Sequence, residues 1–139
     1  MSTPFRLLLP AQIVSDMFTQ ACAELPNECC GLLAGNIETG QVTRRYPLVN
    51  TAASPVLYHN DAKDLFAAFR DMRDHGVEHV AIYHSHPTSE AVPSKTDRAN
   101  NFYGGEMVHF IISVKDGKPS MRGWRLGEEA VREVRWEAI

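Results

Sequence analysis

Two stretches of the chain repeat apolar residues at the three- and four-residue spacing of an amphipathic helix. The first, Ala11 to Glu24, is closed by Pro26. The second follows Asp61, a residue type that caps helices, and stops at Gly76. The apolar positions are Ile13, Met17, Ala21 and Leu25 in the first stretch and Leu65, Phe66, Phe69 and Met72 in the second. We therefore predict two main helices.

Short apolar or alternating runs typical of β-strands fill most of the remaining chain. Turn residues at Asn36 to Gly40 predict a hairpin, and a short third helix is expected around Thr96 to Phe102. The expected strands are Phe5–Leu9, Cys29–Ala34, Gln41–Val49, Val77–Tyr83, Met107–Val114, Met121–Leu126 and Ala130–Trp136. The pattern predicts a mixed α/β fold, with a central, mostly antiparallel sheet of six to seven strands flanked by the helices.

The length of 139 residues suits one domain, expected over residues 1–139. Its hydrophobic fraction of 44% and charged fraction of 22% are typical of globular proteins, and no apolar run is long enough to span a bilayer. The segment Met1 to Leu9 lacks the pattern of an export signal. We expect a cytoplasmic protein that binds no membrane.

The formal net charge of −3 provides no basic field for phosphates, so nucleic acid is not an expected partner. The three cysteines are odd in number and lack C-x-x-C spacing, which argues against a disulfide framework and an all-cysteine zinc site. Free thiols in a reducing compartment are the simpler interpretation. Either a monomer or a homodimer is compatible with the sequence.

The clearest candidate chemistry follows the predicted strand Val77–Tyr83. His84 and His86 are two residues apart, so on an extended backbone both imidazoles point to the same side and can share one metal ion. Asp97 lies beyond a proline-containing loop and supplies a third ligand. Two imidazoles and a carboxylate suit zinc and leave one position open for a catalytic water, although ligand type alone also permits iron or manganese.

Glu28 is the candidate general base, since it precedes an apolar strand, an unusual place for a carboxylate that does not face a polar cavity. Bound zinc lowers the pKa of its water to roughly 7, and peptide cleavage still needs a group that takes the proton and returns it to the leaving amine. Ser94 can donate a hydrogen bond to the oxyanion of the attacked carbonyl, an effect worth about 3 kcal/mol.

These residues form a recognisable pattern. The segment from His84 to Asp97 has the spacing H-x-H-x7-S-x2-D, and Pro26-Asn27-Glu28-Cys29-Cys30-Gly31-Leu32-Leu33-Ala34-Gly35 supplies an upstream glutamate followed by a glycine-leucine strand. This resembles the JAMM (MPN-plus) metalloprotease family, and the order of helices and strands extends the likeness over nearly the whole chain. The resemblance implies the JAMM/MPN fold, which is similar to that of cytidine deaminases.

The resemblance also implies a role for each residue. His84, His86 and Asp97 become zinc ligands, Glu28 the general acid/base and Ser94 the oxyanion stabiliser. The compact bacterial members that the motifs look most like cleave a peptide or isopeptide bond after the C-terminal glycine of a ubiquitin-like or sulfur-carrier protein. We therefore expect a zinc peptidase in which Glu28 assists attack by a zinc-bound water. The sequence names neither the carrier nor the type of bond.

Each feature also has a plainer interpretation. Ser94 and Asp97 match a helix capping box, Glu28 alone is compatible with a solvated strand end, and Cys30 is either a core residue or a thiolate ligand at the open zinc position. A non-catalytic MPN scaffold is the alternative function, and a cupin-like metal site including Glu90 is another. No function is assigned to the remaining histidines, His59, His75, His79 and His109.

Overall fold

The computed structural model describes residues 5–139. Residues 1–4 lie outside the described residues, and with them the start of the expected domain and part of the segment predicted to lack an export signal. Seven strands are described: β1 (Arg6–Leu9), β2 (Cys30–Asn36), β3 (Gln41–Leu48), β4 (Glu78–His86), β5 (Val108–Ser113), β6 (Ser120–Leu126) and β7 (Val131–Ala138). The helices are α1 (Ala11–Ala23), α2 (Ala62–Asp74), α3 (Lys95–Ala99) and the 3-10 turn η1 (Lys115–Gly117).

The strands form one closed sheet in the order β1-β3-β2-β4-β5-β6-β7, because β1 pairs with both β3 and β7. Four of the seven pairings are antiparallel, and three are parallel: β1 with β3, β1 with β7, and β4 with β5. The prediction of a mixed α/β fold with six to seven strands, two main helices and a short third helix is confirmed. The sheet is more mixed than predicted, and its closure was not predicted, since both features depend on pairings between strands distant in the sequence.

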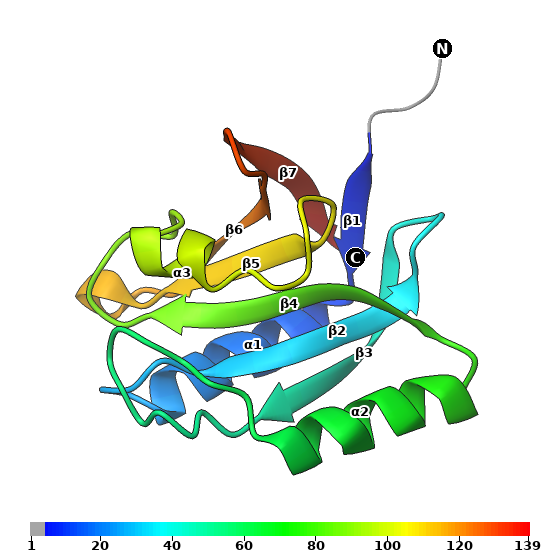
Figure 1. Cartoon of the computed structure of the whole chain (residues 1–139), viewed down its shortest axis with the longest axis horizontal. Coiled ribbons are helices and arrows are strands. Elements are labelled where there is room, and N and C mark those ends of the chain that lie inside the picture. Colours follow the sequence, from blue (N-terminus) through cyan, green and yellow to red (C-terminus); the bar gives the residue numbers. More distant parts are fainter. Residues whose placement is uncertain (1–4) are drawn as a thin grey trace.

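The two long helices cover opposite sides of the sheet, with α1 behind β2 and α2 in front of β3 in Figure 1. A large apolar cluster lies on the α1 side and includes Met17, Tyr83 and Phe110. A smaller one on the α2 side includes Leu32 and Met72. The central strands β2 and β4 are therefore buried on both faces, which agrees with the apolar sequence of β2 and the apolar run Val80 to Tyr83 of β4.

The ends of the helices follow local chemistry. The side chain of Asp61 accepts a hydrogen bond from the backbone N–H of Asp64 and caps α2, as predicted. Gly76, just after the helix, has a φ of 63°, a conformation that glycine adopts without strain. The third helix is shorter than predicted and ends at Ala99, so the segment up to Phe102 is not helical.

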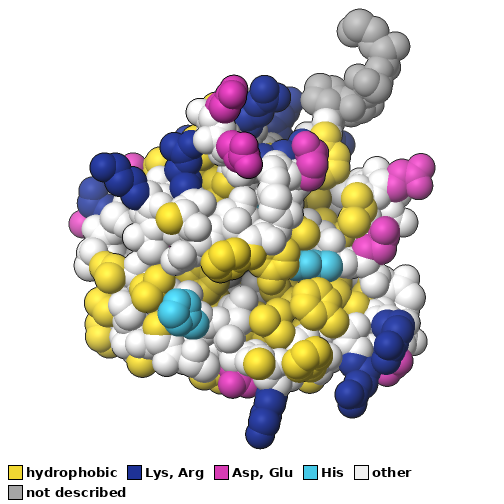
Figure 2. Space-filling model, viewed as in Figure 1, with side chains coloured by type: hydrophobic (Ala, Val, Ile, Leu, Met, Phe, Trp, Pro, Cys, Tyr) yellow, Lys and Arg dark blue, Asp and Glu magenta, His cyan; other side chains and the backbone are white. Residues whose placement is uncertain are grey.

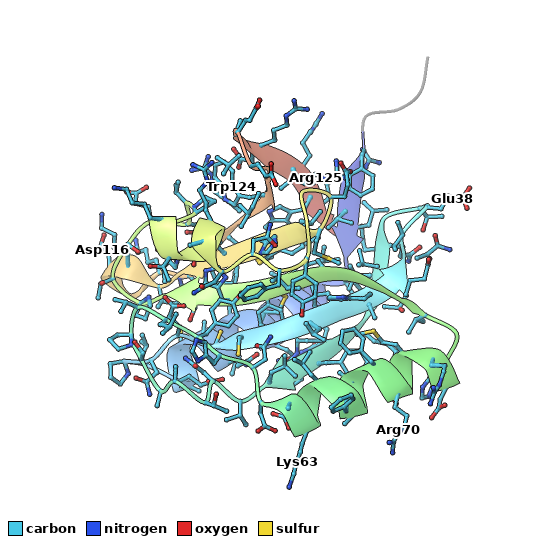
Figure 3. All side chains as sticks on the ribbon, viewed as in Figure 1. Glu38, Lys63, Arg70, Asp116, Trp124 and Arg125 are labelled. Atoms are coloured by element: carbon cyan, nitrogen blue, oxygen red, sulfur yellow. The ribbon has the colours of Figure 1, made fainter. Side chains whose placement is uncertain are left out.

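The exposed side of α2 is polar at its edges, and Figure 3 shows Lys63 and Arg70 pointing away from the sheet. Between α2 and α3, hydrophobic side chains dominate the middle of the face seen in Figure 2, with charged groups mostly at its margin. Within residues 5–139, no helix has both the length and the apolar character needed to cross a bilayer.

Candidate metal centre

Strand β4 ends in two histidines whose rings converge. His84 and His86 are buried, and their Nε2 atoms lie 3.3 Å apart. Both rings lie on the α2 side of the sheet because alternate residues of a strand share a face. Ile82, the preceding residue with the same orientation, packs in the apolar cluster on that side.

Helix α3 brings Asp97 to the same point. One carboxylate oxygen lies 3.0 Å from Nε2 of His84, and the other lies 3.0 Å from Nε2 of His86. Asp97 is held by a capping box, in which its backbone N–H donates to Oγ of Ser94 and its Oδ2 accepts from the backbone N–H of Ser94. The capping interpretation is thus confirmed, and the cap also fixes the carboxylate that faces the histidines.

The three side chains offer one ligand atom each within 4.8 Å of one another. Ligands bound to zinc at about 2.0 Å in a tetrahedron are separated by about 3.3 Å. The two imidazole nitrogens lie 3.3 Å apart, and each lies 3.0 Å from a different oxygen of Asp97. The donor set is therefore compatible with one metal ion bound by both histidines and the carboxylate.

A network of hydrogen bonds fixes His86 and the loop that follows it. Nδ1 of His86 lies 2.8 Å from the backbone carbonyl oxygen of Glu90, so the ring donates there, and Nε2 is the nitrogen that would bind a metal once its own proton is lost. The loop is anchored by Ser113 Oγ, which donates to the carbonyl of Ser89, and by the indole N–H of Trp124 on β6, which donates to the carbonyl of Ala91.

The loop before α2 supplies contacts that sequence reasoning missed. The ring of Tyr58 stacks on His84, with centroids 4.8 Å apart and an interplanar angle of 23°. The amide of Asn50 donates to the backbone carbonyls of Glu28 and Leu57 and ties this loop to the start of β2. A weak signal exists in the sequence, where Asn50 and Tyr58 bracket a turn-rich segment, but nothing in the spacing links that segment to the histidines.

Glu28 lies two residues before the start of β2 and is only 3% exposed. Its backbone N–H donates to the carbonyl of Ser54, and the neighbouring N–H of Cys29 donates to Oγ of Ser85. Oε1 of Glu28 has no hydrogen-bond partner among residues 5–139. The alternative interpretation, in which this carboxyl is merely solvated at a strand end, is therefore wrong, because the group is buried.

The charges around the cluster favour a cation. Burial, partly offset by His86 and reinforced by Asp97, raises the pKa of Glu28 to about 8. Burial also acts to raise the pKa of Asp97, but hydrogen bonds from His84 and His86 outweigh it and hold that pKa well below its usual range. Asp97 is consequently ionised at every ordinary pH, while Glu28 exchanges its proton near neutrality.

Other candidate residues take different places. The side chain of Glu90 is 73% exposed and pairs with Lys115, outside the histidine cluster. The thiol of Cys30 donates to the carbonyl of Leu48 within the apolar cluster on the α2 side, and burial raises its pKa. Ser94 is exposed at the start of α3. A small surface hollow beside Asp97 is lined by Leu57, Tyr58, Thr96, Asp97 and Asn100.

Comparison with known proteins identifies the family. Residues 10–127 match the family described as prokaryotic homologs of the JAB domain. The chain belongs to this JAB family. A CysO-cysteine peptidase of Mycobacterium tuberculosis is 32% identical over 132 residues, covering 94% of this chain and 90% of the relative. A desampylase of Haloferax volcanii is 35% identical over 127 residues, covering 88% and 90%.

The fold of this JAB protein is also similar to a solved structure. The solution structure of a protein from Desulfitobacterium hafniense superimposes with a TM-score of 0.87 at 31% identity, covering 96% of this chain and 92% of that chain. The resemblance to the JAMM/MPN family is confirmed, as is the expectation of an enzyme, at the level of a JAB-type peptidase. The cupin-like alternative is wrong, since the chain belongs to a different family.

Proposed function

We propose that this JAB protein is a zinc-dependent peptidase or isopeptidase that hydrolyses the bond after the C-terminal glycine of a ubiquitin-like or sulfur-carrier protein. The observation that carries the proposal is the convergence of His84, His86 and Asp97 near the buried carboxyl of Glu28. Relatives named CysO-cysteine peptidase and desampylase support a protein-conjugate substrate.

In this proposal His84, His86 and Asp97 hold the metal, and a tetrahedral ion keeps one position open. When bound, zinc supplies Lewis acidity, which acidifies water and polarises the carbonyl under attack. Two imidazole nitrogens and one carboxylate oxygen are a donor set that zinc accepts readily. The carboxylate of Asp97 contributes the negative charge that partly balances the cation.

Glu28 moves the proton. A carboxyl with a pKa of about 8 can accept a proton from the attacking water and return it to the leaving amine near neutral pH. Oε1 of Glu28, which has no partner among residues 5–139, is free to accept that hydrogen bond. Burial therefore serves the reaction, because it brings the pKa of the base toward the working pH.

Ser94 is proposed to stabilise the oxyanion. Its Oγ accepts from the backbone N–H of Asp97, which leaves its hydroxyl proton free to donate. The proton is thereby available to the oxygen of the attacked carbonyl, next to the metal ligand Asp97. One residue thus caps α3 and serves the substrate.

The test measures zinc content together with cleavage of a carrier protein that bears a C-terminal extension after Gly-Gly. Wild type is expected to contain stoichiometric zinc and to cleave. Glu28→Gln keeps the shape of the side chain, and we expect it to retain zinc while turnover falls roughly 10²- to 10⁴-fold. Glu90→Ala is the matched control, because this exposed glutamate lies outside the cluster and its loss should change neither quantity.

Two results would count against the proposal. Full activity of Glu28→Gln would remove the acid/base role from this residue. Stoichiometric zinc in a wild-type protein that cleaves no carrier conjugate would favour the non-catalytic scaffold instead. Removal of the metal by a chelator should abolish cleavage, and added zinc should restore it.

A further inference from the structure

One buried histidine has no role in the proposed reaction. His109 on β5 is 2% exposed, and its Nε2 atom has no hydrogen-bond partner among residues 5–139. Burial, reinforced by the nearby His84, lowers the pKa of His109 to about 4, so the ring is neutral under ordinary conditions. A buried polar atom without a partner costs free energy, which makes its presence here informative.

The sheet places His109 diagonally beside His84. Strands β4 and β5 are parallel, with Ile82 opposite His109 and His84 opposite Ile111. Residues opposite each other share a face of the sheet, and so do residues two apart on one strand, so His109 and His84 point to the same side. The register therefore makes His109 and His84 diagonal neighbours on one face of the sheet.

His84 also has a ring nitrogen without a hydrogen-bond partner. Its Nδ1 atom is buried and has no partner among the described residues, whereas Nδ1 of His86 has the carbonyl of Glu90. A histidine that binds a metal through Nε2 carries its proton on Nδ1 and almost always donates it to an acceptor. Tyr58 stacks on the face of the His84 ring and restricts its rotation, but an aromatic face does not replace that acceptor.

We propose that His109 is a positioning residue for the metal centre: one bridging water accepts a hydrogen bond from Nδ1–H of His84 and donates one to Nε2 of His109. A neutral imidazole protonated on Nδ1 offers one lone pair, at Nε2, so it can act as this acceptor. The water would satisfy both buried nitrogens and keep His84 in the tautomer whose Nε2 binds metal. This inference rests on the proposed metal centre and adds one residue to it.

The experiment measures zinc affinity by competition with a chromogenic chelator. His109→Leu fills the space without an acceptor, and we expect its zinc affinity to fall roughly 10- to 100-fold. His109→Gln restores an acceptor oxygen and should remain within roughly threefold of wild type. His79→Leu is the control, because His79 is a partly buried histidine of β4 that packs against Phe69 and Tyr103 and should leave zinc affinity unchanged.

A second measurement separates positioning from a purely structural role. In chelator, without metal, His109→Leu should be at least as resistant to urea as wild type, because it removes a buried atom that lacks a partner. Wild-type zinc affinity in His109→Leu, or an equal loss in His109→Leu and His109→Gln, would overturn the inference. Failure of wild type itself to bind zinc would instead overturn the proposed function, so the two failures are distinguishable.

Discussion

The two faces of strand β4 are buried to a similar degree but differ in chemistry. Toward α1, Ala81 and Tyr83 pack in the large apolar cluster. Toward α2, Ile82 is followed by His84 and His86, which meet Asp97. One strand therefore contributes alternately to the core and to the candidate site.

The faces differ most in how their polar atoms are satisfied. On the α1 side, the hydroxyl of Tyr83 donates to Gln20 and accepts from Arg45. In residues 5–139, four buried side-chain atoms lack a partner, and three of them surround the site: Glu28 Oε1, His84 Nδ1 and His109 Nε2. Buried polar groups are normally paired, so unpaired ones mark where a ligand, a water or a substrate belongs. On the core face the chain itself satisfies the hydroxyl of Tyr83, whereas on the site face buried polar atoms have no hydrogen-bond partner within residues 5–139.

The largest expected effect comes from removing a ligand on the site face. His84→Ala should lose stoichiometric zinc and reduce conjugate cleavage to background, since two remaining ligands do not make a zinc site. In chelator, the variant should lose less unfolding free energy than a truncation on the opposite face. Metal analysis and urea unfolding check both parts. Retained stoichiometric zinc would show that the metal lies elsewhere.

A truncation on the core face should have the opposite profile. Tyr83→Ala removes a fully buried aromatic ring and is expected to cost about 3–5 kcal/mol of unfolding free energy. Zinc affinity of the folded fraction should change little. Urea unfolding, with zinc titration below the transition, measures both quantities. A tenfold loss of zinc affinity without loss of stability would reverse the assignment of the two faces.

Gly31 sharpens the same test. A Cβ atom at this position would overlap the ring of Tyr83, so Gly31→Ala should be strongly destabilising in the wild-type background. In the Tyr83→Ala background the clash is gone. The double-mutant cycle should therefore show strong coupling, and additive effects would contradict the described packing.

Variants of Ser94 separate its role as the cap of α3 from its proposed role as the oxyanion stabiliser. Ser94→Ala loses both the cap and the hydroxyl and should lower turnover roughly 10²- to 10³-fold, with about 1 kcal/mol of lost stability. Ser94→Asn preserves a good cap without the hydroxyl, so its stability should return while its turnover stays low. Steady-state kinetics and thermal unfolding of both variants check this. Recovery of turnover in Ser94→Asn would leave the serine with a capping role alone.

The smallest effect concerns pH in the metal-free protein. The pKa of Glu28 is raised from 4.5 unfolded to about 8 folded, so the folded state binds the extra proton between these values. The contribution of Glu28 to stability is thus full below about pH 4.5 and is lost as the pH rises toward 8. Two groups face Glu28: His86, which titrates in both wild type and Glu28→Gln, and Asp97, which stays ionised in both. Unfolding in chelator from pH 5 to 8 should show a decline in wild type that is smaller in Glu28→Gln, and identical slopes would contradict it.

Much of the fold could be predicted from the sequence because its signals are local. The spacing of apolar residues marks α1 and α2, and Asp61 and Gly76 mark the ends of the second helix through their own chemistry. The hairpin of β2 and β3 follows from the turn between them. The third helix is predicted too long at its C-terminal end, because its only strong sequence signal, the capping box at Ser94, marks where a helix begins and not where it ends.

The rest depends on contacts between distant segments. The parallel pairing of β4 with β5 and the closure of the sheet through β1 join elements whose sequences carry no mark of each other. The motif residues could be chosen because their spacing is fixed, and their roles remain proposals. Tyr58 and His109 could not be chosen from the sequence, since only the folded chain places them next to His84, and no sequence spacing links them to it.

The pairing of β1 also bears on how the protein is made. This strand of four residues matches β7 over four positions, from Arg6 opposite Arg135 to Leu9 opposite Ala138, but matches β3 at one. Residues 6–9 therefore leave the ribosome long before the strand that holds them. At the usual speed of translation that interval is on the order of ten seconds. During that interval Leu7 and Leu9, which are fully buried in the folded protein, do not yet have the strand β7 beside which they pack.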